Sequence, residues 1–119
     1  MFDVEGPLLD KSLKFAVRIV KLYQYLVNEK KESIISKQII RSGTSIGANA
    51  NEAAYGVSPA DFISKMQIAL KETAETEYWL RLLVLSGYIE QVYGDPIISD
   101  CLEIKRILIA SLKTARSKK

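Results

Sequence analysis

Four long segments with the spacing of amphipathic helices fill almost the whole chain, and this pattern favours an all-helical fold. In each segment apolar residues recur every three or four positions, which is the period of an α-helix. Four helices joined by short turns are typical of an antiparallel up-down-up-down four-helix bundle. We therefore expect one all-α domain over residues 1–119, with helices over about 8–28, 36–55, 59–86 and 96–113 and a basic tail over 114–119.

Cap signals mark several helix ends. Ser58 is suited to the N-cap position and Pro59 to the first helical position, so the third helix is expected to begin there. The pair Asp95 and Pro96 repeats this pattern and predicts the start of the fourth helix. Gly87 is expected to close the third helix, because glycine adopts the left-handed backbone found just after helix ends.

The second helix contains two glycines, which is unusual because each costs a helix about 1 kcal/mol relative to alanine. Gly43 and Gly47 lie among serines and alanines, and such small residues let another helix approach closely. A flexible loop is the alternative. The regular placement of Ile39, Ile46 and Ala53 favours the helix.

The first helix has a wider apolar arc than one bundle core requires, and Ile107 and Ile109 widen the fourth helix in the same way. Surplus apolar surface of this kind usually marks a contact between subunits. We expect a homo-oligomer.

The chain has no histidine and a single cysteine, Cys101. These counts exclude Ser-His-Asp and Cys-His nucleophiles, histidine-ligated metals, an intrachain disulfide and a thiolate zinc cluster. We expect Cys101 to be a small core residue, and we expect no catalytic, cofactor-binding or metal-binding residue. The lone thiol, the lack of a membrane-spanning stretch and a beginning unlike a signal peptide together predict a cytoplasmic protein without a membrane partner.

Charge is unevenly distributed behind a net value of +3. Residues 1–50 carry +3, residues 51–100 carry −5 and residues 101–119 carry +5. Cations repeat along one face of the first helix and in the tail, which suits contact with the phosphates of RNA or DNA. The candidate nucleic-acid-binding residues are Lys11, Lys14, Arg18, Lys21, Lys113 and Arg116. A solvated face with a soluble tail is the alternative.

Polar residues also align on the second and third helices. Arg41, Ser45, Asn49 and Glu52 follow one face of the second helix, and Glu72, Glu75 and Trp79 share a face of the third. Glu52, Glu72 and Glu75 could form a carboxylate-dependent active site or a di-metal site, but ferritin-like metal bundles also need histidines. We therefore favour a polar network between helices, with Asn49 and Glu52 bonded to neighbours.

Several runs of sequence resemble one bacterial family over about residues 8–112. They are the run from Gln38 to Glu52 (QIIRSGTSIGANANE), Asp61–Ile63, Ile68–Glu72 (IALKE), Glu75–Leu80 (ETEYWL) and Leu85–Ile89 (LSGYI). Together they resemble the ribosomal RNA intervening-sequence proteins, which are four-helix bundles first noticed as reading frames within large-subunit ribosomal RNA genes.

The resemblance implies an antiparallel bundle that assembles into a ring-like homopentamer without known enzymatic activity. It marks Arg41, Ser45, Asn49, Glu52 and Glu75 as signature positions, which we interpret as structural polar contacts. A related group, the accessory variability proteins of diversity-generating retroelements, works with a reverse transcriptase and binds nucleic acid through a basic surface. The implied partners are a second copy of the chain, RNA or DNA, and a reverse transcriptase or another protein.

These observations predict a non-enzymatic oligomeric helix bundle that binds the backbone of RNA or DNA through a basic surface. The first alternative is a protein-interaction scaffold that binds no nucleic acid. The second is a carboxylate-dependent enzyme that uses Glu52, Glu72 and Glu75.

Overall fold

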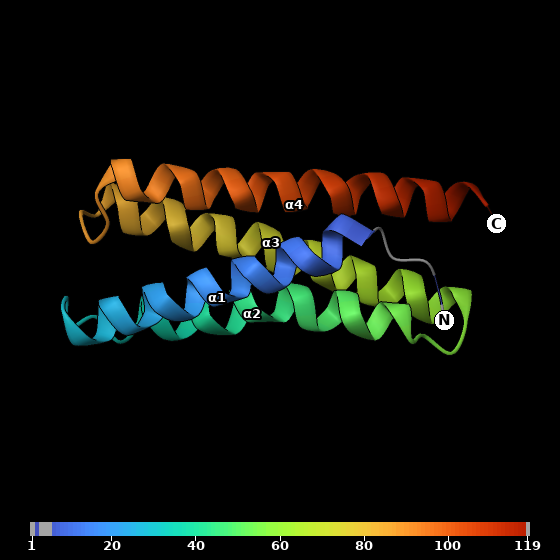
Figure 1. The fold of residues 1–119 in the computed structure, drawn as a ribbon, viewed down its shortest axis with the longest axis horizontal. Coiled ribbons are helices and arrows are strands. Elements are labelled where there is room, and N and C mark those ends of the chain that lie inside the picture. Colours follow the sequence, from blue (N-terminus) through green and yellow to red (C-terminus); the bar gives the residue numbers. More distant parts are fainter. Residues whose placement is uncertain (1, 3–5, 119) are drawn as a thin grey trace.

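Four helices account for nearly all of the described chain (Figure 1). The computed structural model describes residue 2 and residues 6–118. The helices are α1 (Gly6–Asn28), α2 (Ile35–Ala54), α3 (Pro59–Leu85) and α4 (Gln91–Ser117). No strand occurs over these residues, so the all-α prediction is confirmed. None of the four helices, over the same residues, is long and apolar enough to cross a membrane.

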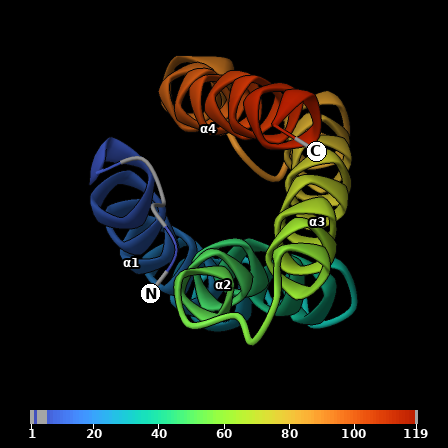
Figure 2. The ribbon, with the colours of Figure 1, turned by 90° about the vertical axis from the view of Figure 1, so that its right-hand side faces the viewer.

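The helices surround one apolar core and form a body that measures 47 × 21 × 19 Å between Cα atoms. Seen end-on, each helix lies beside the next one along the chain (Figure 2). The largest fully buried side chains come from all four helices and include Phe15, Ile46, Leu80 and Leu108. Burial of one such side chain contributes about 1.5–3 kcal/mol. The packing between α1 and α4 is the least extensive of the four helix pairs that pack together.

Close packing of α1 on α2 depends on the two glycines of α2. A Cβ atom at Gly43 would lie 2.8 Å from Cγ2 of Ile19, and one at Gly47 would lie 3.1 Å from Oγ of Ser12. α2 is continuous across both glycines, which excludes the loop alternative. The two glycines let α1 approach α2 closely, as predicted from the run of small residues in which they lie.

The start of α3 agrees with its cap signals. Oγ of Ser58 accepts a hydrogen bond from the backbone N–H of Asp61 at 3.0 Å, and Pro59 occupies the first turn. The Asp61 carboxylate in turn accepts from the N–H of Val57 at 3.1 Å. This reciprocal pair satisfies two backbone donors that the helix itself leaves unbonded.

The end of α3 is closed by a Schellman motif, as expected from Gly87, whose φ is +86°. The N–H of Gly87 donates to the carbonyl of Val84 at 3.1 Å, and the N–H of Tyr88 donates to that of Leu83 at 2.9 Å.

The predicted bounds of α4 are wrong at both ends. The helix begins at Gln91, because the carbonyl of Glu90 accepts from the N–H groups of Tyr93 and Gly94 at 3.0 and 2.9 Å. Gly94 allows this extra turn to press against Val84 of α3, where a side chain would clash. Pro96 therefore lies inside α4. The predicted basic tail is helical as far as Ser117, and Lys119 lies outside the described residues.

The start of α2 depends on Glu32, which was not predicted to have a structural role. Its carboxylate accepts hydrogen bonds from the N–H groups of Ile34, Ile35 and Ser36 at 3.1, 3.0 and 2.7 Å. Oγ of Ser36 donates back to the carbonyl of Glu32 at 2.9 Å. Burial would raise the pKa of the Glu32 carboxyl, but the three backbone donors outweigh it and hold that pKa below its ordinary value.

Candidate functional site

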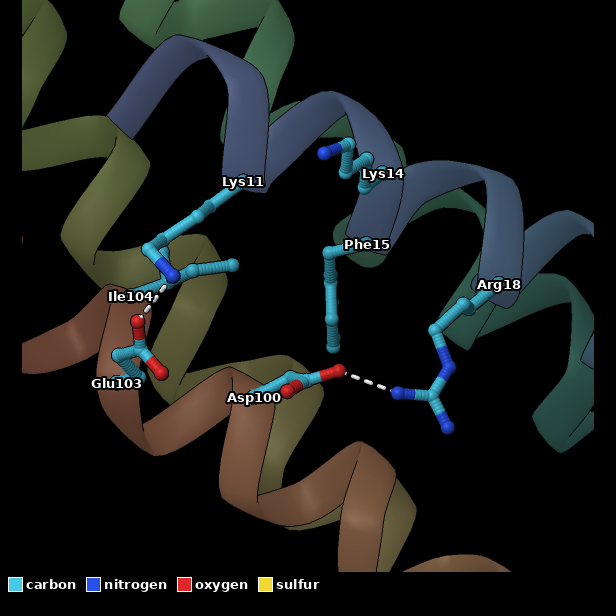
Figure 3. Close-up of a pocket in the computed structure, with 7 residues that line it drawn as sticks. All are labelled: Lys11, Lys14, Phe15, Arg18, Asp100, Glu103 and Ile104. Atoms are coloured by element: carbon cyan, nitrogen blue, oxygen red, sulfur yellow. Dashed lines mark hydrogen bonds and ion pairs between the residues drawn. The ribbon is translucent and has the colours of Figure 1, made fainter. Parts of the chain in front are cut away.

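Of the cations predicted on the first helix, Lys11, Lys14 and Arg18 lie along the edge of α1 that faces α4 (Figure 3). Lys11 forms an ion pair with Glu103, and Arg18 forms one with Asp100. Both acids belong to α4, so the basic row binds an acidic row of the same molecule. Neither acid was predicted to belong to the site, although their spacing of three places them on one face of a helix.

A small pocket of about 150 Å³ lies between the two ion pairs. Phe15 projects between them in Figure 3, and Ile104 lies beside Glu103 on α4. Hydrogen bonding to Glu103 raises the pKa of Lys11, and the same bond lowers the pKa of Glu103. Both groups stay charged near neutral pH, so this edge carries opposite charges in close pairs.

The other predicted cations differ in their surroundings. Lys14 pairs with Asp10 of the same helix at 3.0 Å. Lys21, Lys113 and Arg116 are exposed, and over residues 6–118 none of them forms an ion pair. The predicted cations that have no ion pair over these residues are therefore divided between α1 and the C-terminal turns of α4.

The signature residue Arg41 bridges α2 and α3. Its guanidinium donates to Glu72 at 3.1 Å and also to Glu75. Nε1 of Trp79 donates to the same Glu75 carboxylate at 2.9 Å. The indole N–H lowers the pKa of Glu75, burial opposes this effect, and Arg41 adds to it. Of the residues predicted to align on α3, Glu72 and Glu75 thus contact Arg41, and Trp79 contacts Glu75.

The remaining signature residues, Ser45, Asn49 and Glu52, form fewer contacts between helices than we expected. Oγ of Ser45 donates to the carbonyl of Arg41 at 2.6 Å, and Nδ2 of Asn49 donates to the carbonyl of Ser45 at 2.8 Å. Both bonds stay within α2, so the prediction that Asn49 bonds to a neighbouring helix is wrong. Glu52 does reach α3, where its carboxylate lies 3.8 Å from Nζ of Lys65.

Buried hydroxyl groups provide a contact between α2 and α3 that the sequence analysis did not identify. Oγ1 of Thr76 lies 2.9 Å from Oγ of Ser42, and both residues are fully buried. In the sequence, such a hydrogen-bonded pair is indicated only by small polar residues at positions that face the core.

The groups considered for catalysis are engaged or inaccessible. Glu72 and Glu75 bind Arg41, and Glu52 pairs with Lys65. Cys101 is buried, and burial raises the pKa of its thiol to about 12, so the reactive thiolate is not formed near neutral pH. The part of the chain that the structure describes holds no cluster of three His, Cys, Asp or Glu side chains able to bind a metal ion.

An apolar row lies on the outer surface of α1. Leu13, Val17 and Val20 follow the helical period, and Leu13 has 65% of its surface exposed. Ile109 is also exposed on α4, whereas Ile107 packs against the core. The surplus apolar surface predicted for α1 is therefore real, and that predicted for α4 is reduced to Ile109.

These features define an all-α four-helix protein in which ion pairs join α1 to α4 and α2 to α3. The chain belongs to the 23S rRNA-intervening sequence protein family, whose model matches residues 7–110. It is similar to the crystal structure of a protein of unknown function from the S23 ribosomal protein family of Bacteroides thetaiotaomicron. The two are 57% identical with a TM-score of 0.88, over 89% of this chain and 95% of that chain. No curated protein matches the chain.

Proposed function

We propose that the protein is a non-enzymatic module that assembles through the outer face of α1. In this proposal the helices form an antiparallel up-down-up-down bundle, and bundles associate side by side into a ring-like homo-oligomer. The family resemblance implies five copies. The observation that carries the proposal is the exposed row of Leu13, Val17 and Val20, because a monomer gains nothing from three large apolar side chains in water.

The charges beside this row favour a ring over a simple antiparallel pair. Lys14, Arg18 and Lys21 flank the row along one side of α1. Lys14 and Arg18 pair with Asp10 and Asp100, so of these three cations Lys21 is the one without an ion pair over residues 6–118. A two-fold antiparallel pairing of two α1 rows would place the Lys21 side chains of both copies on the same side of the contact, which is unfavourable. Contact between the row and a different face of the next copy avoids this repulsion. Such heterologous contacts close into rings when the rotation permits.

Replacing Leu13 and Val17 by glutamate tests the proposal. Burying two carboxylates in an apolar contact is strongly unfavourable, so we expect L13E/V17E to run as a single 13.4 kDa chain in size-exclusion chromatography with light scattering. Glutamates at Ser64 and Gln67, exposed on α3, add the same charge and should leave assembly intact. A monomeric wild-type protein, or an L13E/V17E variant that still assembles, would overturn the proposal.

A second function, binding of the RNA or DNA backbone, is supported by the exposed cations Lys21, Lys113 and Arg116. Each has a charge that no described acid neutralises, and a ring would repeat the set in every copy. Repeated weak contacts to one polyanion give avid binding without base recognition. A reverse transcriptase or another protein remains the partner proposed for the scaffold alternative.

Filter binding of a single-stranded RNA at about 50 mM and about 200 mM salt tests this second function. We expect K21E/K113E/R116E to weaken binding at least about tenfold and to reduce the salt dependence, because phosphate contacts are lost. K30E/K31E/K37E makes the same change in net charge near the connection between α1 and α2, and should bind like the wild type. Equal losses in both variants, or no retention of RNA at low salt, would favour the scaffold.

A further inference from the structure

One end of the molecule carries an exposed apolar patch formed by the connection between α3 and α4. Leu85, Val92 and Tyr93 are large and strongly exposed, with 85% of Leu85 and 68% of Tyr93 accessible. Val92 and Tyr93 belong to this patch because α4 begins at Gln91. Gly94 lets the first turn of α4 pack closely against Val84. The connection between α1 and α2 reaches the same end in Figure 1 and adds the exposed Ile34.

Acidic groups surround this patch. Glu90 and Asp95 are exposed, and over residues 6–118 neither forms an ion pair. Residues 86–95 contain no lysine or arginine. In the neighbouring connection the charges of Glu29, Lys30, Lys31 and Glu32 cancel, and Lys37 in the first turn of α2 adds one positive charge. Together with Glu90 and Asp95 these residues carry a net charge of −1, and we call this end the acidic end.

The opposite end combines exposed apolar residues with the other sign of charge. Tyr55 and Val57 lie in the connection between α2 and α3, and 92% of Val57 is exposed. The C-terminal turns of α4 reach the same end, which faces the viewer in Figure 2. They bring Lys113, Arg116 and Lys118, while Asp61 is the acid of the α3 cap. We call this the basic end.

From these two surfaces we infer that the acidic end of one copy docks on the basic end of a second copy, so that bundles stack end to end. The occupant of the acidic end is thus the Tyr55–Val57 connection and the basic turns of α4 from another molecule. The contact joins apolar residues to apolar residues and acids to cations. It uses no residue of the α1 row, so it does not depend on side-by-side assembly. Because the two surfaces differ, the contact is heterologous, and repetition gives a column.

The size of the ends sets the strength of this contact. A cross-section of 21 × 19 Å between Cα atoms offers on the order of 400 Å² per partner. This is about half of what each partner buries in a stable interface, so two single bundles should associate only at high concentration. A ring would present several such ends together, and the column would then be held by avidity.

Small-angle scattering over a range of concentrations tests the inference, because stacking lengthens the particle and side-by-side assembly does not. Starting from bundles of 47 Å, an end-to-end pair should be about twice as long. We expect lengthening at low salt and little at about 500 mM salt, where exposed charges are screened. L13E/V17E should still lengthen at the high concentrations that single bundles require, which separates failure of this inference from failure of the proposed ring.

Charge reversal identifies the two surfaces. E90K/D95K and K113E/R116E should each abolish lengthening, since each variant carries like charges at both ends. An equimolar mixture should restore it, because the positive ends of the first variant meet the negative ends of the second. S64K/Q67K, with cations added on the side of α3, should stack like the wild type. Unchanged length in wild-type protein at every concentration, stacking by either single variant, or no recovery in the mixture of folded variants would overturn the inference.

Discussion

Replacing Gly43 by alanine should destabilise the bundle by about 1–3 kcal/mol, although alanine favours an isolated helix by about 1 kcal/mol. The new Cβ atom would lie 2.8 and 2.9 Å from Cγ2 and Cγ1 of Ile19. Ile19 is fully buried and branched at Cβ, so it cannot turn away without disturbing the core. Urea unfolding at one fixed protein concentration measures the change.

Two comparisons make this expectation specific. Gly47→Ala should cost much less, because its nearest neighbour is Oγ of Ser12 at 3.1 Å, and a few tenths of an ångström relieve the contact. Ile19→Ala creates a cavity and should itself cost about 2–5 kcal/mol, but Gly43→Ala should add little more in that background. Ile19→Val keeps both clashing atoms and should give no relief. A Gly43→Ala protein as stable as the wild type would refute this account of the packing of α1 on α2.

Replacing Glu32 by alanine should cost about 1–2 kcal/mol at neutral pH, because three backbone N–H groups lose their acceptor at the start of α2. Only 8% of Glu32 is exposed, so water cannot readily replace the carboxylate. The negative charge also interacts favourably with the positive end of the helix. Glu32→Gln keeps one oxygen acceptor but not the charge. Its free energy of unfolding should therefore lie between those of the wild type and Glu32→Ala.

The effect of Glu32→Ala should depend on pH. The pKa of Glu32 is lower in the folded protein than its usual value of about 4.3, so its ionised form favours folding. This contribution is complete above the unfolded pKa and disappears as the pH falls through the folded pKa. The stability difference between wild type and Glu32→Ala should therefore shrink between about pH 5 and pH 2. Glu29→Ala, at an exposed acid in the same turn, should show neither effect. A constant difference across this range would contradict the role assigned to the carboxylate.

Local signals in the sequence were sufficient for most helix bounds. The start of α3 follows from Ser58 and Pro59, and its end follows from Gly87, because those interactions involve neighbours in the chain. The pair Asp95 and Pro96 imitates the same start signal, but the fit of Gly94 against Val84 decides where α4 begins. That contact depends on how two helices pack, which periodicity does not reveal.

The candidate site was less predictable for the same reason. The row of cations on α1 is evident from spacing, but its neutralisation by Asp100 and Glu103 depends on the register between α1 and α4. Glu32 looked like one charge among several in a turn, and only its burial distinguishes it from Glu29. Arg41 and Glu75, which the family resemblance marks as signature positions, form an ion pair between the consecutive helices α2 and α3.

The edge between α1 and α4 also determines how the bundle responds to mechanical load. Gly6 and Ser117, the outer ends of these two helices, lie toward the same end of the molecule (Figure 1). A force that draws these two ends apart would act first at that end of the molecule. It would then separate α1 from α4 progressively, one helical turn after another. Resistance would rise only at the ion pairs of Lys11 and Arg18 and at Phe15 beneath them. The protein would therefore yield to tension between its ends at lower force than a fold whose outer elements must be sheared along their length.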